Sequence, residues 1–214
     1  MRVHDISLAI DGDLPTWPTS EGFRVRDAMR IADGDPANVS VVEMDVHTGT
    51  HVEAPLHFLD GGDPLDAFEL ERFVGPARVV AVEGPAVTAE ALEEAGVPDG
   101  TLRLLVKTDN SRRWAAGWGP FDPEYVSLTG DAARWVAGHG IRLVGIDHLS
   151  IQRYDDDGET HRILMRAGVA ILEGLNLHGI EAREYTLVAV PLRLAGREAA
   201  PARAVLIDAP RPSA

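Results

Sequence analysis

Residues 132–146 read Ala-Ala-Arg-Trp-Val-Ala-Gly-His-Gly-Ile-Arg-Leu-Val-Gly-Ile, a helix pattern that turns directly into a strand pattern. Ala132, Trp135 and Val136 recur at helical spacing and share one face, and the glycines after them are placed to end that helix. Residues 141–146 form a short apolar run, which is typical of a buried strand. A helix followed at once by a buried strand is the repeating unit of an α/β fold.

The same alternation extends outward in both directions along the chain. Thr88 is placed to cap a short helix that runs through Ala95. Further strand-like runs lie at residues 77–82, 102–107, 169–172, 186–192 and 203–207. We therefore expect a single compact α/β domain over residues 1–214 with a mixed central sheet. The N-terminal third is more irregular and is expected to hold a β-hairpin layer of its own.

Composition excludes several classes of function. Acidic residues outnumber basic ones by 34 to 20, and the resulting net charge of −14 disfavours binding to nucleic acid or anionic membranes. The absence of cysteine excludes disulfides, thiolate zinc sites and a cysteine nucleophile. No apolar run approaches the roughly 20 residues that span a bilayer, and the N-terminus lacks the apolar core of a signal peptide. We expect a cytoplasmic protein.

The densest group of metal-binding side chains lies in residues 47–57, His-Thr-Gly-Thr-His-Val-Glu-Ala-Pro-Leu-His. A catalytic metal site needs about three protein ligands and an open position, and His47, His51 and Glu53 supply two imidazoles and a carboxylate. Such a metal lowers the pKa of bound water from about 15.7 to roughly 7, so a hydroxide nucleophile is expected. His57 suits a proton shuttle, since the ordinary pKa of histidine is about 6.5. A regulatory, non-catalytic metal is the alternative.

The local pattern also predicts how these ligands converge. Apolar and polar residues alternate over residues 39–47, which predicts a strand that ends with His47 on its polar face. A glycine turn follows and is expected to bring His51 back towards His47. His51 and Glu53 are two residues apart in an extended segment, so their side chains share a face.

A second group of donors lies downstream. Glu173 directly follows the apolar run 169–172, at the carboxyl end of a predicted strand, where α/β folds place active sites. His161 precedes that strand. If His161 and Glu173 converge on the first group, the ligands suffice for two metal ions. The alternatives are a surface position for His161 and a helix cap or turn for Glu173.

Two further residues are candidates for supporting roles. Trp17 lies between Pro15 and Pro18 in a rigid extended segment, from which its ring could line a pocket or cover the edge of the core. Asp147 follows the strand at residues 141–146. Its carboxylate could orient a ligand imidazole or could belong to a turn at the end of that strand.

The motif at residues 47–57 resembles the signature of the cyclase family of metal-dependent hydrolases, which includes bacterial kynurenine formamidases. That signature is similar to His-x-Gly-Thr-His-x-Asp-Ala-Pro-x-His, and only Glu53 departs from it. The resemblance continues through most of the chain, over residues 5–7, 15–18, 104–108, 145–150, 161, 171–175, 191–192 and 201–204. It implies a swivelling β/β/α fold that assembles as homodimers, tetramers or other oligomers.

The resemblance also implies roles for the metal ligands. His47 and His51 would bind one metal ion and His161 the second, while Glu53 and Glu173 would bridge them. The metal would be zinc, with manganese as the alternative. Glutamate at position 53 is one methylene longer than the family's aspartate, so either one or two ions per chain are compatible with the sequence.

The implied activity is hydrolysis of a small amide C–N bond, as in kynurenine formamidase and tryptophan catabolism. His57 would act as the general acid/base, and Trp17 would pack against an aromatic substrate. The same family also opens lactones and cyclic amides such as isatin, which gives a second enzyme hypothesis. A metal-binding module without catalytic activity is the third.

Overall fold

Apolar strands form the centre of the structure, a computed structural model that describes residues 1–119 and 121–208. These are β5 (Val74–Ala81), β6 (Arg103–Lys107), β7 (Leu143–Ile146) and β8 (Ala170–Glu173), which lie side by side and run parallel. Parallel strands are usually covered on both faces, which explains why their sequences are apolar almost throughout. Their carboxyl ends meet at one edge of the sheet, and the candidate site lies there.

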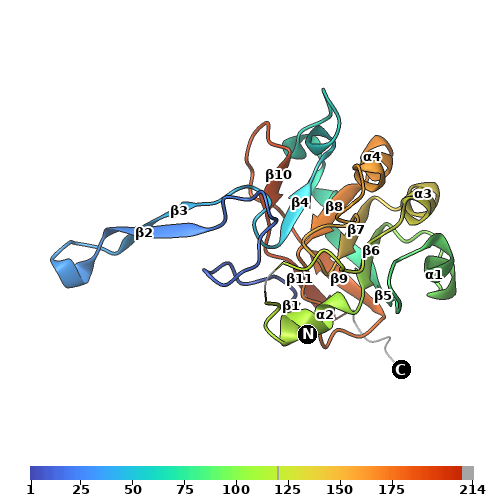
Figure 1. Ribbon diagram of the computed structural model, residues 1–214, viewed down its shortest axis with the longest axis horizontal. Coiled ribbons are helices and arrows are strands. Elements are labelled where there is room, and N and C mark those ends of the chain that lie inside the picture. Colours follow the sequence, from blue (N-terminus) through green and yellow to red (C-terminus); the bar gives the residue numbers. More distant parts are fainter. Residues whose placement is uncertain (120, 209–214) are drawn as a thin grey trace.

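Antiparallel strands extend this centre on both sides into a curled, nine-stranded mixed sheet, in the order β1-β11-β9-β5-β6-β7-β8-β4-β10 (Figure 1). The expected α/β class with a mixed central sheet is confirmed. The added strands are β1 (Val3–Asp5), β11 (Val205–Asp208) and β9 (Glu184–Val188) on one side, and β4 (His51–Glu53) and β10 (Ala199–Pro201) on the other.

Helices cover one face of the sheet (Figure 1). The covering helices are α1 (Ala89–Glu94), α3 (Gly130–Gly138) and α4 (Glu159–Arg166); α2 is Asn110–Ala115, and short 3-10 helices span Ile31–Asp33, Pro55–His57, Leu65–Ala67 and Leu70–Arg72. Thr88 caps α1 as predicted, accepting a hydrogen bond from the Ala91 N–H at 3.1 Å. Within the described residues, no helix combines the length and apolar character that crossing a membrane requires.

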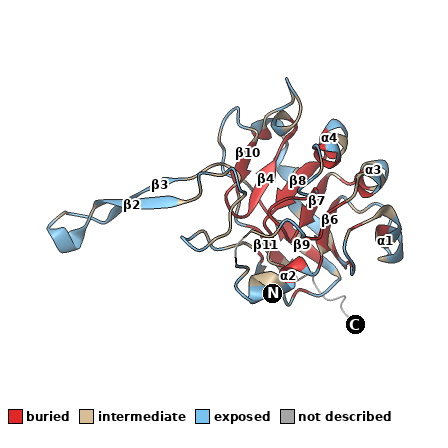
Figure 2. Cartoon of the chain, viewed as in Figure 1, coloured by how far each residue is buried: buried red, intermediate tan, exposed pale blue. Residues whose placement is uncertain are grey.

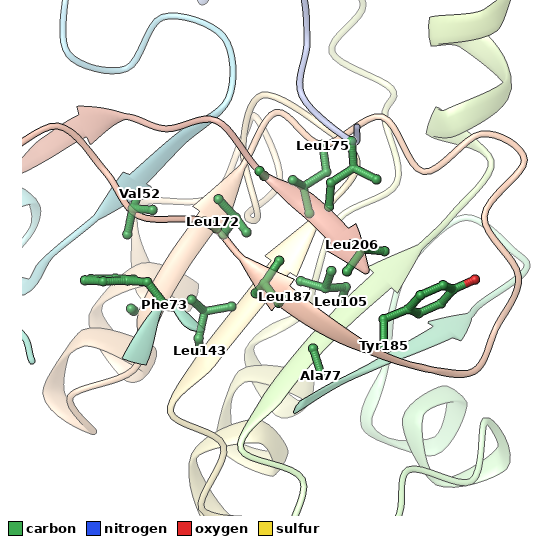
Figure 3. Packing of buried hydrophobic residues seen from close by; sticks show 14 of the residues in the cluster. Val52, Phe73, Ala77, Leu105, Leu143, Leu172, Leu175, Tyr185, Leu187 and Leu206 are labelled. Carbon is green, nitrogen blue, oxygen red and sulfur yellow. The ribbon is translucent and has the colours of Figure 1, made fainter. Parts of the chain in front are cut away.

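Successive residues of a strand point to opposite faces and so build two hydrophobic cores. Leu104 and Val106 of β6 pack under the helices, whereas Leu105 between them belongs to the core on the other face. Figure 3 shows that second core, in which Leu105 lies near Leu187 of β9. Figure 2 shows burial concentrated along the sheet, with the helices exposed on their outer sides. The two cores fix the strand register, and with it the position of the site.

The expected hairpin is present as β2 (Arg24–Met29) and β3 (Val39–Glu43), which form a separate two-stranded sheet. This segment, residues 24–43, projects away from the body of the protein and is here named the arm (Figure 1). Nearly every residue of both strands is exposed (Figure 2). The arm leads directly into residues 44–46, which connect it to the motif.

The predicted strand over residues 39–47 is wrong in its extent. The strand ends at Glu43, and His47 lies in a turn. Val41 and Val42 point to opposite faces, yet they are 38% and 50% exposed. The described residues place no second layer over either face of the arm, so alternation there does not mark a buried side.

Candidate metal centre

The register of β4 against β8 places His51 directly opposite Glu173. Because β4 runs antiparallel to β8, the first residue of β4 lies beside the last residue of β8. His51 Nε2 lies 3.4 Å from Glu173 Oε2, and both side chains are buried. The structure therefore brings the two predicted groups together at the carboxyl edge of the parallel strands.

Glu53 occupies the middle of the cluster and directs one carboxylate oxygen towards each group. Its Oε1 lies 3.0 Å from His47 Nδ1 and 3.5 Å from His51 Nε2. Its Oε2 lies 3.1 Å from His161 Nε2. The donor atoms thus form two sets, each within 4.8 Å, that share Glu53: His47, His51 and Glu53 make the first set, and Glu53, His161 and Glu173 the second.

His161 reaches the centre from the first turn of α4, and the Asp156 carboxylate fixes where that helix begins. This carboxylate accepts hydrogen bonds from two backbone N–H groups at the start of the helix, at 2.9 and 3.0 Å. Phe58 stacks on the imidazole with 4.3 Å between ring centroids. His161 Nε2 then lies 3.2 Å from Glu173 Oε1. The convergence on which the two-metal hypothesis depends is present.

His57 lies at the rim of the cluster. Its Nε2 is 3.4 Å from Glu53 Oε1, and its ring centroid is 4.2 Å from that of His47. The His57 side chain is 30% exposed, whereas that of Glu53 is 2% exposed. His57 belongs to neither donor set, so it is free to exchange protons with solvent and with a bound molecule.

The donor chemistry fits a divalent metal. Within the described residues, His51 Nε2 and Glu53 Oε2 are buried without a hydrogen-bond partner. Leaving buried polar atoms unpaired costs about 1–3 kcal/mol each, unless another group satisfies them. Imidazole nitrogen and carboxylate oxygen together suit several divalent metals, among them zinc, manganese and iron. The residues present therefore fit one metal ion per donor set.

The cluster also perturbs its own protonation. Burial disfavours the charged forms, but the carboxylates of Glu173 and Glu53 outweigh it and raise the pKa of His51 to about 10. In the same way they raise the pKa of His161 to about 9. Burial alone would raise the pKa of Glu53, but the facing histidines, His161 above all, outweigh burial. The pKa of the Glu53 carboxyl therefore lies well below its usual range. For His57, burial dominates and lowers the pKa.

A cavity of about 420 Å³ opens onto the cluster. Aromatic rings form part of its wall, since Trp17, Tyr154 and Phe58 line it. Trp17 packs edge-on against Phe121 with 5.2 Å between ring centroids, and its ring is tilted against that of Tyr154 at 5.3 Å. Of the two positions open for Trp17, the structure shows the one that lines a cavity, and this wall suits a flat, apolar ring.

Comparison with known proteins identifies the family. The family model described as "Putative cyclase" matches residues 4–153. The chain belongs to the cyclase family. A cyclase-like protein 3 of Arabidopsis thaliana is 40% identical over 96% of this chain and 79% of its own length. The kynurenine formamidase of Maricaulis maris is 35% identical over 98% and 99% of the two chains.

A solved member of the cyclase family has the same fold. The structure of a potential metal-dependent hydrolase with cyclase activity superposes with a TM-score of 0.83 at 34% identity, covering 98% of this chain and 99% of that one. The family resemblance deduced from residues 47–57 is thus confirmed over nearly the whole length, arm included.

Three side chains near this cyclase centre were missed by the sequence reasoning. Gln152 accepts a hydrogen bond from His161 Nδ1 at 2.6 Å, Tyr154 lines the cavity, and Phe121 packs against Trp17 and Tyr154. Gln152 and Tyr154 follow β7 at the carboxyl edge of the sheet. Their position after a predicted strand could have marked them as candidates. No motif in the sequence distinguishes them from other polar or aromatic residues that follow a strand.

Asp147, by contrast, does not orient a ligand imidazole. Its carboxylate accepts hydrogen bonds from Thr108 and Ser111, with the two hydroxyl groups at 2.7 and 2.6 Å. The alternative of a turn at the strand end is the correct one. The carboxylate fastens the segment after β6 to the end of β7, which supports the edge of the sheet that carries the site.

Loading the centre with zinc is expected to release protons. His51 and His161 are protonated in the metal-free protein at pH 7, because their pKa values are about 10 and about 9. Both must lose a proton to bind a metal, whereas the Glu53 carboxylate is already ionised. We therefore expect about two protons per chain to be released at pH 7, and zinc affinity to rise with pH up to about pH 9–10.

Calorimetric zinc titration in buffers of different ionisation enthalpy measures this release directly. The apparent binding enthalpy is expected to change with the buffer in proportion to the protons released. An enthalpy that is the same in every buffer would contradict the protonation states assigned to the two histidines.

Proposed function

We propose that this cyclase-family chain hydrolyses the C–N bond of a small aryl amide, with N-formylkynurenine as the reference substrate. The observation that carries the proposal is the sharing of Glu53 between two donor sets, buried except for the partly exposed His47, beneath an aromatic-walled cavity. A relative that is 35% identical over nearly the full length is a kynurenine formamidase. The expected class of enzyme, a metal-dependent amidohydrolase, is confirmed by its relatives.

Two divalent metal ions per chain are proposed, zinc in preference to manganese. His47 and His51 would hold one, His161 and Glu173 the other, with Glu53 between them. A bound metal of this kind lowers the pKa of water and so supplies hydroxide near neutral pH. The position of Glu53 supports bridging, because its two oxygens already face different donor sets. Glu53 is one methylene longer than the aspartate of the family signature, and its carboxylate still lies between His47 and His161.

The other residues are assigned to substrate binding and proton transfer. The aryl ring would lie against Trp17 and Tyr154, which places the amide over the cluster. His57 is largely neutral at pH 7, since burial lowers its pKa, so it can accept a proton from water. It would then donate that proton to the departing nitrogen, and its position at the rim gives it access to both partners.

Steady-state rates on three substrates test this proposal. We expect the zinc-loaded protein to hydrolyse N-formylkynurenine with a kcat/KM at least about tenfold above those for isatin and a simple lactone. A lactone or isatin as the best substrate would favour the second enzyme hypothesis. Failure to turn over all three with zinc, manganese or cobalt supplied would contradict the proposed function. On the first outcome, we would assign the protein to tryptophan catabolism in the cytoplasm.

We also propose that residues 1–214 act as one domain that pairs with a second copy through the arm. An isolated two-stranded hairpin is only marginally stable in water, so a partner surface would stabilise the arm. The arm offers apolar side chains on both faces, with the pair Val25–Val42 on one and the pair Met29–Val39 on the other. A groove of about 510 Å³ begins at the base of the arm and is partly apolar, lined in part by Leu8, Ile10, Met44, Leu192 and Pro201. Two copies related by a two-fold axis could exchange arms, each filling the other's groove.

Placing glutamate at both Val25 and Val42 tests this pairing. These residues face each other across the hairpin, so two charges there would repel each other and resist burial. We expect the wild-type protein to sediment as a dimer and the double variant as a monomer, with Ala182→Glu as a control at an exposed site on the body. A wild-type monomer, or an unchanged dimer in the double variant, would contradict the arrangement.

A further inference from the structure

Each buried histidine of the centre, His51 and His161, has one ring nitrogen facing the donor sets and the other within hydrogen-bond distance of an oxygen outside them. His51 Nδ1 lies 2.9 Å from the carbonyl oxygen of Gly49, within its own turn. His161 Nδ1 lies 2.6 Å from the side-chain oxygen of Gln152. The first contact is supplied by a backbone carbonyl oxygen and needs no particular acceptor side chain. The second contact is made by a side chain, so it exists only while residue 152 carries an acceptor that reaches His161.

The orientation of the Gln152 amide follows from its two contacts. Its nitrogen donates to the carbonyl oxygen of Asp156 at 3.5 Å, because a carbonyl can only accept. The amide oxygen must then be the atom that faces His161. An amide oxygen accepts and cannot donate, so His161 Nδ1 carries the proton. In the neutral imidazole the lone pair is therefore on Nε2, which faces Glu53 and Glu173.

The backbone around Gln152 is itself held in place. The Tyr125 hydroxyl donates to the Gln152 carbonyl at 2.6 Å. The preceding residue, Ile151, donates its N–H to Glu173 Oε1 at 2.6 Å. One short segment after β7 thus contacts both residues that complete the second donor set. No comparable contact runs from this segment, among the described residues, to His47 or His51.

We propose that Gln152 is a positioning residue that fixes the tautomer and ring orientation of His161 and thereby sets the affinity of the second donor set for metal. The proposal rests on the proposed metal centre and adds that one residue affects the metal affinity of only one of the two donor sets. Groups that hold the outer nitrogen of a ligand histidine typically contribute 10–100-fold to metal affinity. Because Gln152 contacts His161 alone among the ligands, its loss should weaken one metal position and spare the other.

Substitutions Gln152→Leu and Gln152→Glu separate this role from a structural one. Leucine removes the acceptor while keeping approximate volume, whereas glutamate keeps an acceptor oxygen facing Nδ1. We expect Gln152→Leu to weaken one of the two zinc equivalents 10–100-fold in chelator competition, with the other unchanged. Gln152→Glu should restore that affinity. With cadmium-113 bound, the leucine variant should shift or broaden one of two metal resonances.

The outcomes distinguish this inference from the function on which it rests. Wild-type protein that binds no metal would overturn both. Wild-type protein with two zinc equivalents and an unchanged leucine variant would overturn only the role of Gln152. Equal weakening of both equivalents, or a loss that glutamate does not restore, would also overturn it, because that result indicates general damage to the site. Melting temperatures of the metal-free variants report such damage independently.

Discussion

Replacement of His51 with alanine is expected to lower kcat/KM by at least about three orders of magnitude and to remove at least one metal equivalent. Metal ions contribute several kcal/mol of transition-state stabilisation, and each 1.36 kcal/mol corresponds to about a tenfold change in rate. His51 Nε2 is buried, lacks a hydrogen-bond partner and lies within 3.5 Å of both Glu53 and Glu173. Elemental analysis and steady-state rates measure the two effects.

The matched control is His178→Ala, which removes an exposed imidazole away from the centre. It should keep the metal content and rate of the wild-type protein. If the His51 variant retained both metal equivalents and its activity, His51 would not be a ligand. Because the substitution leaves two buried carboxylates less well paired, the folded state of the variant should be verified by circular dichroism.

Replacement of His57 with glutamine is expected to lower kcat by about 10²–10⁴-fold, the usual contribution of a general acid/base, while both metal equivalents remain. His57 lies outside both donor sets, is 30% exposed and approaches Glu53 Oε1 at 3.4 Å. Glutamine keeps the polarity and approximate size of the side chain but cannot exchange a proton near neutral pH. Metal content and single-turnover rates report the two properties separately.

The comparison between His51 and His57 is the informative one. Metal loss in the His57 variant equal to that in the His51 variant would make His57 a ligand rather than an acid/base. A His57 variant with full activity would remove it from the reaction, and the proton donor would then have to be sought among the other residues that line the cavity.

The sequence predicted most of the ligand set because local spacing and strand position are both encoded there. His51 and Glu53 share a face of β4 as a two-residue separation requires. Glu173 ends an apolar strand, which predicted its place at the carboxyl edge. What spacing could not give was the antiparallel register of β4 against β8, which sets His51 opposite Glu173. That register depends on packing between distant strands.

Other parts of the site depend on contacts that no local pattern reports. The contact between Gln152 and His161 joins the segment after β7 to α4, two parts of the chain that a local pattern does not relate. Trp17 and Tyr154 line the cavity and Phe121 packs against both, and these three side chains come from three separate segments. The strand over residues 39–47 was predicted too long, because it ends at Glu43 and His47 lies in a turn. The alternation of apolar and polar residues belongs to a hairpin whose strands are exposed.

The measurement that tests the central account most directly is the number of metal ions per chain in protein purified without chelators, followed through removal and restoration of activity. The account predicts two ions per chain, loss of amide hydrolysis when they are removed, and recovery as two equivalents of zinc are returned. Full activity in exhaustively chelated, metal-free protein would contradict it.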